Sequence, residues 1–459
     1  MNHNLYTAYK DTCSPPQNPF LAFFSPESES LLFDDGDEIC LWVQAGLRSL
    51  DLSWRLHRNR IETPFLAGVE ESRPGNRFII TLPTNDLPPG FYDLRVTLET
   101  GMPAPGDARS AQRPVEGICT FGWQVNAMPI ATSRPKDFRR FWDGAKAQLE
   151  QVPLQAEELP LDSFSGEAID QYNREHAALP GRWNPGGIRC ETVESGKVSF
   201  AAADGGRVYG WLAKPKGKGP FPAMLVLPGA GFGARPRPLE HARHGYLALD
   251  IQVHGQDVDQ EDYPILPGYS EGQQYDTPAA HYYYHVHLRC VQAVRYLLSR
   301  PDVDPERLVV AGGSQGGRLG IVTAALDARV KAVVCCIINS PNVPHLRWVD
   351  ACNRQRVDGM DRVGAPPVPD DAESRCMAYY DPMNFAPEIT CPVLMNAGLI
   401  DPVSPPFSPW AVYQGLRSTD QTIVPLPGLG HDWSAAFDRQ AWRWLAERMP
   451  VRELSEELA

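Results

Sequence analysis

The sequence of 459 residues contains no apolar run that approaches the length of a membrane-spanning helix. It also lacks an excess of basic residues, since 56 acidic residues against 43 basic ones give a net charge of -13. Such a charge argues against nucleic acid or an anionic membrane as a partner. The ten cysteines contain no C-x-x-C pair. Cys40, Cys119, Cys335 and Cys391 lie in apolar strand patterns, and we interpret them as buried thiols rather than as a disulfide framework.

The first residues of the chain lack the basic and apolar regions of a signal peptide. We therefore expect a cytoplasmic protein, or a secreted or periplasmic one from which a signal has been removed. The composition is ordinary for a folded globular protein, and the length is sufficient for more than one domain.

The most informative motif is Gly-Gly-Ser-Gln-Gly-Gly at residues 312–317. A buried strand pattern precedes it, and a helical stretch over residues 318–326 follows. This order is typical of a nucleophile elbow, in which glycines allow a turn tight enough to expose the central serine. The pattern predicts that Ser314 is a catalytic nucleophile. The alternative is a glycine-rich connection that carries an inert serine.

A catalytic serine needs a histidine base, and in proteins with this elbow the chain order is serine, acid, histidine. Only His345 and His431 follow Ser314. His345 comes soon after the hydrophobic strand predicted at residues 330–338, too early to follow an acid. His431 lies in a glycine-containing loop before the helix predicted at residues 435–448. We predict that His431 is the general base and that His345 lines the pocket or caps a helix.

The acid should follow the strand predicted at residues 391–398, and Asp401 is the carboxylate in the loop beyond it. A buried aspartate at this point would hold the imidazole tautomer and stabilise the imidazolium. Asp420 lies in a polar turn, and Asp432 abuts the histidine, where its carboxylate would hardly reach the ring. The sequence therefore favours Asp401, with a simple turn aspartate as the alternative.

The oxyanion hole needs two backbone donors. One is expected at Gln315, directly after the nucleophile. The other is expected at Ala230, because a Pro-Gly-Ala-Gly loop follows the apolar run at residues 223–227 and its glycines allow the backbone to approach a substrate. An ordinary turn at the end of a strand is the alternative interpretation.

His281, His285 and His287 lie close together in the sequence beside three tyrosines. On a helix His281 and His285 would be one turn apart, but no H-E-x-x-H motif or carboxylate-rich partner accompanies them. We expect these histidines to pack near the rim of the active site rather than to bind a metal.

From about residue 136 to the C-terminus the chain resembles the acetyl xylan esterases and cephalosporin C deacetylases of the α/β-hydrolase superfamily. The resemblance implies a Ser-Asp-His triad at Ser314, Asp401 and His431, and acetyl groups on carbohydrate hydroxyls as the substrate. It is carried by the segments at residues 138–143, 204–212, 282–284, 302–307, 312–317, 381–387 and 398–401.

The chain also departs from the family pattern at three places. His254-Gly255-Gln256 replaces an arginine-glycine-glutamine segment, which removes a fixed cation and its fork of donors. Asp432 follows the base where the family has glutamate, and Ala230 replaces the tyrosine of the oxyanion loop. These features resemble a two-domain branch of acetyl xylan esterases. They leave the specificity for acyl group and alcohol open.

Before residue 130 the sequence pattern is that of strands. Apolar residues alternate with polar ones at residues 52–56 and 92–98, and turn clusters separate further candidates at residues 39–43, 77–82 and 118–125. This pattern predicts an immunoglobulin-like β-sandwich over residues 1–130. An amphipathic helix over residues 138–149 then opens an α/β-hydrolase domain with a doubly wound sheet over residues 131–459. The sandwich is expected to be a structural accessory, with carbohydrate binding as the alternative.

We predict a serine esterase that removes acetyl groups from carbohydrate esters, acts through an acyl-enzyme and needs no metal or organic cofactor. Its expected partner is a small-molecule or oligosaccharide ester, and a homo-oligomer is left open. A prolyl-oligopeptidase-like peptidase, a broad carboxylesterase and a non-enzymatic scaffold are the alternatives. The residues expected to contact substrate are His254, Gln256, Tyr283, Trp348 and Trp433.

Overall fold

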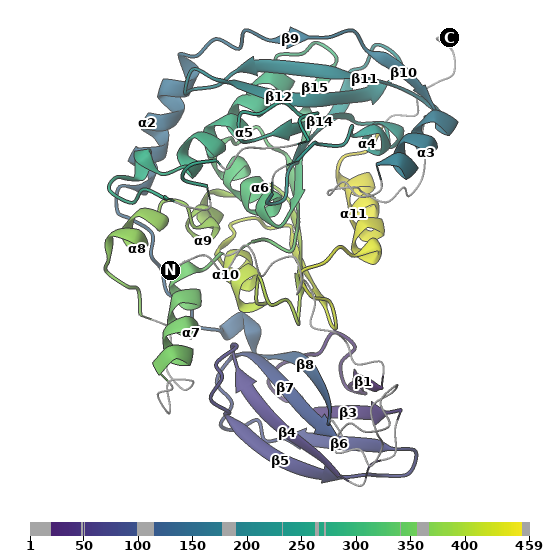
Figure 1. Cartoon of the computed structure of the whole chain (residues 1–459), viewed down its shortest axis with the longest axis vertical. Helices are drawn as coiled ribbons and strands as arrows, with labels where there is room; N and C mark the ends of the chain where they lie inside the picture. Colours follow the sequence, from purple (N-terminus) through teal and green to yellow (C-terminus); the bar gives the residue numbers. More distant parts are fainter. Residues whose placement is uncertain are drawn as a thin grey trace.

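A computed structural model of the chain describes residues 20–46, 49, 51–98, 114–176, 190–231, 233–261, 266–269, 272–339, 341–355 and 367–451. Figure 1 shows an all-β region at one end of the molecule and a larger region of mixed strands and helices at the other. Within the described ranges, no helix combines the length and the apolar character needed to cross a membrane.

The N-terminal region contains two sheets. One has the strand order β1-β3-β6 and the other has the order β2-β8-β7-β4-β5. Side chains alternate between core and solvent along the strands, so Leu52, Trp54 and Leu56 point inward from β4. The strands are β1 (Leu21–Phe24), β2 (Leu32–Phe33), β3 (Ile39–Ala45), β4 (Asp51–Arg58), β5 (Leu66–Glu71), β6 (Arg77–Leu82), β7 (Gly90–Leu98) and β8 (Val115–Trp123).

The larger region is built on a sheet with the order β10-β11-β12-β14-β13-β15-β16-β17-β18, and β9 pairs with β11. The strands from β14 and β13 to β18 are mutually parallel, whereas β12 is antiparallel to β14. The strands are β9 (Glu157–Glu158), β10 (Asp162–Ser165), β11 (Thr192–Ala201), β12 (Arg207–Pro215), β13 (Phe221–Leu227), β14 (Leu247–Gln252), β15 (Val303–Gly313), β16 (Ala332–Cys336), β17 (Val393–Gly398) and β18 (Gln421–Leu426).

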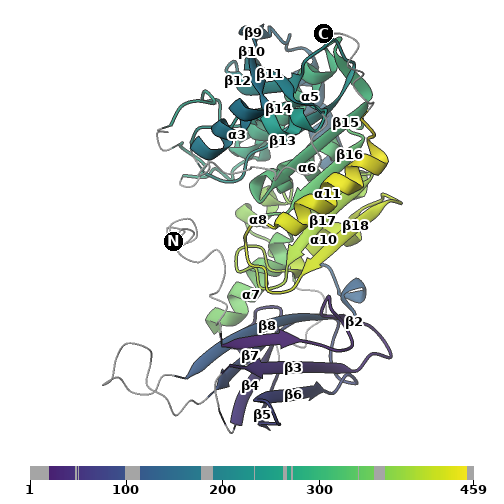
Figure 2. The ribbon, with the colours of Figure 1, turned by 90° about the vertical axis from the view of Figure 1, so that its right-hand side faces the viewer.

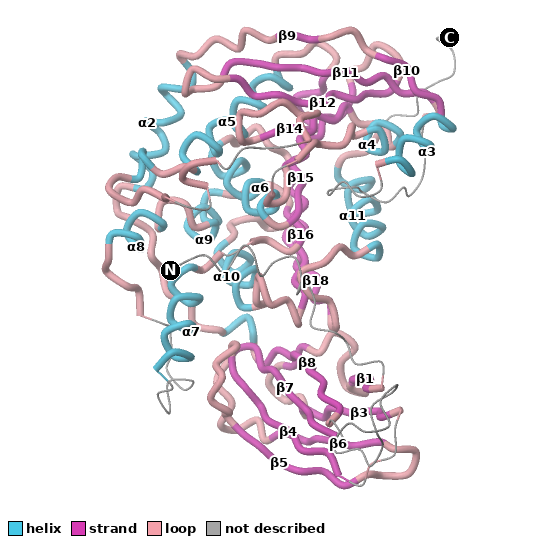
Figure 3. The backbone as a smooth tube through the Cα atoms, in the orientation of Figure 1, coloured by secondary structure: helices cyan, strands magenta, loops and turns pink. Residues whose placement is uncertain are grey.

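Helices cover both faces of this sheet. Figure 3 shows α2, α5, α6, α9 and α10 on one side of β15, β16 and β18, with α4 and α11 on the other. Strand β13 therefore has no solvent-facing side: Leu225 packs toward the first set of helices and Met224 toward α11. The helices are α2 (Phe138–Glu150), α3 (Gly166–Glu175), α4 (Leu239–Arg243), α5 (Tyr283–Leu298), α6 (Gln315–Leu326), α7 (Val343–Gln355), α8 (Ala372–Met377), α9 (Pro382–Phe385), α10 (Phe407–Gly415) and α11 (Ala435–Arg448), with 3-10 turns η2 (Val125–Ala127), η3 (Pro278–Ala280) and η5 (Ala386–Glu388).

The polar segment at residues 154–187 is predicted from its sequence to be irregular and to wrap the surface, but its described part is more regular than that. It contains β9, β10 and α3, and its residues 177–187 lie outside the described residues. Helix α3 begins at Ser165, whose hydroxyl accepts a hydrogen bond from the backbone N–H of Ala168. Cys40 and Cys391, expected to be buried thiols, are half-buried free thiols.

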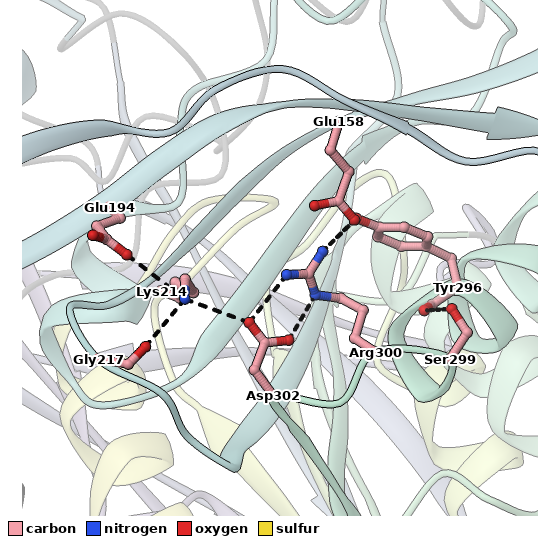
Figure 4. A network of polar contacts seen from close by, with 8 residues as sticks. All are labelled: Glu158, Glu194, Lys214, Gly217, Tyr296, Ser299, Arg300 and Asp302. Carbon is pink, nitrogen blue, oxygen red and sulfur yellow. Dashed lines mark hydrogen bonds and ion pairs between the residues drawn. The ribbon is translucent and has the colours of Figure 1, made fainter.

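A network of charged side chains fastens the antiparallel edge of the large sheet to α5 (Figure 4). Arg300 forms a two-pronged ion pair with Asp302, with N–O distances of 2.9 and 3.0 Å, and also bonds to Glu158 of β9. Lys214 of β12 contacts Asp302 at 3.5 Å and Glu194 of β11 at 3.6 Å. The network connects β9, β11, β12 and the turn before β15.

The two regions share an apolar core. Phe91 of β7 packs edge-to-face on Trp410 of α10, with ring centroids 5.4 Å apart. Leu399, in the turn that follows β17, and Trp348 of α7 are buried in the same cluster as the inward residues of the N-terminal strands. In Figures 1 and 2 the N-terminal strands lie next to α7 and α10, at one end of the larger region.

Candidate active site

Ser314 lies at the junction of β15 and α6, where the strand ends at Gly313 and the helix begins at Gln315. Its backbone has φ 55° and ψ -120°, a conformation that residues with a side chain rarely adopt. The backbone N–H of Ser314 donates to the carbonyl of Cys336 on β16 at 2.9 Å. The strained turn is therefore fixed to the neighbouring strand and presents the hydroxyl beyond the end of the sheet.

Two glycines of the motif are required by close backbone approach. A Cβ on Gly316 would lie 2.2 Å from the carbonyl oxygen of Leu227, and a Cβ on Gly312 would lie 2.6 Å from the carbonyl carbon of Gly316. Such distances are far below van der Waals contact. The start of α6 therefore passes directly over the ends of β13 and β15. This close packing fixes the position of Ser314 relative to the end of the sheet.

His431 connects the serine to a carboxylate. Its Nε2 is 2.9 Å from Ser314 Oγ, and its Nδ1 is 2.8 Å from Asp401 Oδ2. A tautomer that donates from Nδ1 to the carboxylate leaves Nε2 to accept the serine proton. The side chains of His431 and Asp401 are 7% and 1% exposed, so this chain of hydrogen bonds is shielded from water.

The Asp401 carboxylate is held on both oxygens. Oδ1 accepts backbone hydrogen bonds from Val403 and Ser404, each at 2.8 Å, and Oδ2 accepts from His431. Of the competing carboxylates, Asp420 pairs with Arg448 at 2.7 Å, and Asp432 accepts the backbone N–H of the residue after it.

The loops that carry the acid and the base are joined through their backbones. The N–H of Leu399 donates to Leu426 at 3.1 Å, and that of Ile400 donates to Leu429 at 3.2 Å. A Cβ on Gly398 would lie 2.6 Å from the carbonyl oxygens of both Leu429 and Gly430. The absence of a side chain at Gly398 thus allows the base loop to cross the end of β17.

The proposed oxyanion donors lie on adjacent segments. Gln315 is the first residue of α6, where backbone N–H groups have no partner within the helix, and Ala230 is half-buried in the loop after β13. The Gln315 side chain connects them, because its Nε2 donates to the carbonyl of Gly229 at 3.4 Å. Its Oε1 accepts the hydroxyls of Tyr269 at 2.8 Å and Tyr283 at 2.9 Å.

Tyr269 is the supporting residue that sequence reasoning missed. Its hydroxyl donates to Gln315 and accepts the backbone N–H of Gly231 at 3.3 Å, next to Ala230. No pattern in the sequence distinguishes Tyr269 from the other tyrosines. Tyr283, expected to contact substrate, is buried and has the Arg318 guanidinium 4.5 Å from its ring centroid.

His254 and Gln256, also expected to contact substrate, differ in how deeply they are buried. His254 is buried, and its Nδ1 is 2.8 Å from the Tyr282 hydroxyl. Burial, together with nearby Arg289 and Arg235, lowers the pKa of His254 to about 3, so its ring is neutral at ordinary pH. Gln256 is half-buried in the loop after β14.

The two tryptophans differ in position. Trp348 is buried in the core shared with the N-terminal strands, with its ring 5.8 Å from that of His345. His345 is itself buried and stacks on Phe407, with ring centroids 4.2 Å apart. Trp433 is half-buried beside the elbow, since a Cβ on Gly313 would lie 3.5 Å from its Cζ3. Of the two, Trp433 is the one next to the nucleophile.

The three clustered histidines do not share one helix. His281 follows η3, whereas His285 and His287 lie on α5. His281 and His287 are buried against the ring of Tyr380, and burial lowers the pKa of His281 to about 4. Across the described part of the chain, no group of three or more His, Cys, Asp or Glu side chains is arranged to hold a metal ion.

Comparisons with known proteins identify a matching family and a related sequence. The acetyl xylan esterase (AXE1) family matches residues 171–448, a range that contains Ser314, Asp401 and His431. Acetyl esterase Axe7A of Xylanibacter ruminicola is 28% identical over 347 residues, which cover 73% of this chain and 70% of that protein.

Two solved structures have a similar fold. The acetyl xylan esterase from Paenibacillus sp. R4 aligns with a TM-score of 0.53 and 26% identity, covering 71% of this chain and 98% of that one. Acetyl xylan esterase 1 from Thermoanaerobacterium sp. JW/SL YS485 aligns with a TM-score of 0.54 and 23% identity, covering 70% of this chain and 96% of that one. The mixed region therefore has the architecture of α/β-hydrolase esterases.

Proposed function

Because the chain belongs to the acetyl xylan esterase family and is a serine carboxylic ester hydrolase, we propose that it removes acetyl groups from carbohydrate esters through Ser314, His431 and Asp401. The observation that carries the proposal is the unbroken chain of hydrogen bonds from the Ser314 hydroxyl through His431 to Asp401, at 2.9 and 2.8 Å. Its members come from three separate loops at the same end of the parallel strands.

In the proposed mechanism, Ser314 Oγ attacks the ester carbonyl while His431 Nε2 takes its proton. The Asp401 carboxylate stabilises the imidazolium that forms. The negative charge on the carbonyl oxygen is stabilised by the backbone N–H groups of Gln315 and Ala230. His431 then protonates the departing sugar alkoxide. A water molecule, activated by the same imidazole, hydrolyses the acetyl-enzyme and regenerates the serine.

The triad assignment is tested by Ser314→Ala. The variant lacks the nucleophile but keeps the elbow glycines, so it should fold normally and lose p-nitrophenyl acetate turnover by several orders of magnitude. Circular dichroism and the melting temperature provide the folding control. Hydrolysis at the wild-type rate by the folded variant would remove Ser314 from the mechanism.

The substrate assignment is tested by comparing esters. We expect rapid hydrolysis of acetate, slower hydrolysis of propionate and little of octanoate, because a small acyl pocket excludes long chains by clash. Acetylated xylo-oligosaccharide should be deacetylated, and a proline amide should be left intact. If octanoate had the highest kcat/KM, a broad carboxylesterase would replace the proposal, and cleavage of the amide would indicate a peptidase.

We also propose that residues 1–130 form an immunoglobulin-like accessory domain and residues 131–459 the catalytic domain. The two N-terminal sheets and the strand order of the larger sheet support this division. The half-buried Trp433 is the proposed contact for a sugar face, since aromatic rings offer flat apolar area beside polar groups.

A further inference from the structure

We propose that Arg60, in the N-terminal β region, is a positioning residue for the catalytic acid of the hydrolase. The proposal rests on the triad assigned above, and it gives the N-terminal sheets a direct part in the geometry of catalysis. Arg60 follows β4 in the sequence, 341 positions before Asp401.

The guanidinium of Arg60 binds the backbone of the acid loop. Its Nη2 donates to the carbonyl of Leu399 at 3.1 Å and to the carbonyl of Asp401 at 3.3 Å. These two acceptors are the acid itself and the residue two positions before it. The same short segment reaches the base loop through the N–H groups of Leu399 and Ile400. Arg60 therefore binds carbonyl groups of the same segment whose N–H groups bind the base loop.

The other arm of the guanidinium is anchored in the N-terminal sheet. Nη1 of Arg60 is 3.2 Å from Asp93 Oδ2 on β7, and the Asp93 side chain is only 2% exposed. Asp93 Oδ1 accepts the hydroxyl of Thr120 on β8 at 2.7 Å, which fixes the carboxylate. A planar guanidinium is suited to this task, because its rigid fork serves two sets of acceptors at once.

The backbone at Arg60 is strained in a way that the side chain explains. Asn59 and Arg60 have φ values of 48° and 66°, and the N–H of Ile61 closes the turn on the carbonyl of Arg58 at 2.9 Å. Turns with two left-handed central residues favour Asn followed by Gly. A residue with a long side chain in the second position is strained, and such strain is typically kept where a functional geometry needs it.

The turn is also held from the hydrolase side. Asn353 of α7 donates from Nδ2 to the carbonyl of Arg60 at 3.1 Å and accepts the backbone N–H of Glu62 at 2.7 Å. On the sandwich side, Asn59 Oδ1 accepts the N–H of Phe91 at 3.0 Å. Arg60 thus starts from a fixed point, and its side chain is 17% exposed. Because the guanidinium is held in place, it can fix the position of the acid loop, whereas a mobile surface arginine could not.

The test compares Arg60→Gly and Arg60→Lys with the wild type. Glycine suits the left-handed backbone and removes the donor, whereas lysine keeps a charge for Asp93 but loses the fork. The matched control is Arg95→Gln, which removes an arginine of β7 that pairs with Glu62 at 2.8 Å. Asp401→Asn tests the triad itself. All variants are studied as full-length chains, with active sites counted by a phosphonate titrant.

We expect Arg60→Gly to lower kcat per titrated site about 10- to 100-fold with KM within about twofold, because a small shift of the acid misaligns the imidazole. Arg60→Lys should fall between Arg60→Gly and the wild type. Arg95→Gln should retain the wild-type kcat, and Asp401→Asn should lose roughly 10⁴-fold.

Three outcomes would count against the proposal, and they are distinguishable. If Arg60→Gly keeps the wild-type kcat per titrated site, Arg60 only fastens the two regions together, even if the melting temperature falls. If Asp401→Asn keeps full activity, the acid assignment itself is wrong and the positioning role disappears with it. A loss of kcat in Arg60→Gly equal to that in Arg95→Gln would also count against a specific role.

Discussion

At the scale of single residues, the site depends on places where the backbone leaves no room for a side chain. Ser314 lies on such a turn and has a positive φ. A Cβ on Gly316 would lie only 2.2 Å from the carbonyl oxygen of Leu227. The nucleophile is therefore placed by main-chain packing as much as by its own hydrogen bonds. The contribution of this packing can therefore be tested by replacing a single glycine.

We predict that Gly316→Ala disrupts the elbow. The new methyl group meets backbone atoms that cannot move without shifting β13, so kcat on p-nitrophenyl acetate should fall at least about 100-fold and the melting temperature should drop. Gly144→Ala is the control, because Gly144 of α2 has open space at its Cβ and alanine favours helices. Full activity of Gly316→Ala would contradict the geometry of the elbow.

Tyr269 allows a second test at this scale. Tyr269→Phe removes the hydroxyl that connects Gln315 to the Gly231 N–H, so the oxyanion loop loses a support while Tyr283 keeps its bond to Gln315. We expect kcat to fall roughly tenfold with a smaller change in KM, as measured by steady-state kinetics. Tyr296→Phe, whose hydroxyl bonds to Glu158 in another part of the molecule, should leave kcat unchanged.

At the scale of elements, the charged network of Figure 4 ties the antiparallel edge to the parallel strands. Burial acts to raise the pKa of Asp302, but the hydrogen bonds and charge of Arg300, with help from Lys214, outweigh it and hold the pKa below its usual value. The ionised carboxylate therefore stabilises the fold above the ordinary aspartate range. This contribution is lost as the pH falls through the lowered folded pKa.

The corresponding prediction concerns Asp302→Asn. Near neutral pH the variant should melt about 2–4 °C below the wild type, because Arg300 loses its two-pronged partner. The difference should shrink as the pH falls from about 4 through the lowered pKa of Asp302, because the wild-type carboxylate then becomes protonated. Thermal melts across this range are the measurement, with Glu306→Gln as the exposed control. A difference that stays constant with pH would exclude the electrostatic explanation.

The elements with strong periodicity were predictable from the sequence. The helix expected at residues 435–448 has those bounds in the structure, and the amphipathic helix expected at residues 138–149 extends by one residue. Helix α3 was missed because a single residue, Ile169, is fully buried on it, which is too little for an apolar stripe. Its signals were the Ser165 cap and the glutamate that follows soon after it.

The local context of the site could likewise be derived, because the elbow glycines and the loops after parallel strands are sequence features. The structure brings Ser314, Asp401 and His431 together as the order of the chain suggested. Tyr269 and Arg60 could not be found in this way. Their roles come from contacts over 46 and 341 positions of the chain, and no local pattern encodes such contacts.

At the scale of the whole molecule, the core that joins the two regions predicts cooperative unfolding. Trp410 packs on Phe91 and is 3% exposed, so Trp410→Ala should destabilise the protein by about 3–5 kcal/mol. Calorimetry should show one transition that moves to lower temperature as a whole. Val69→Ala, at a residue 65% exposed on β5, is the control. Two transitions, with the first one unmoved by the substitution, would show that the regions unfold separately.

Gly398 has a consequence for inheritance. Every amino acid that a single base change can introduce at a glycine codon carries a Cβ, and at this position that atom would lie 2.6 Å from two carbonyl oxygens. Single substitutions of Gly398 are therefore not tolerated where the base loop crosses the end of β17. Related proteins should therefore keep glycine at this position together with the spacing of the two loops. Substitutions that change specificity are expected at other positions.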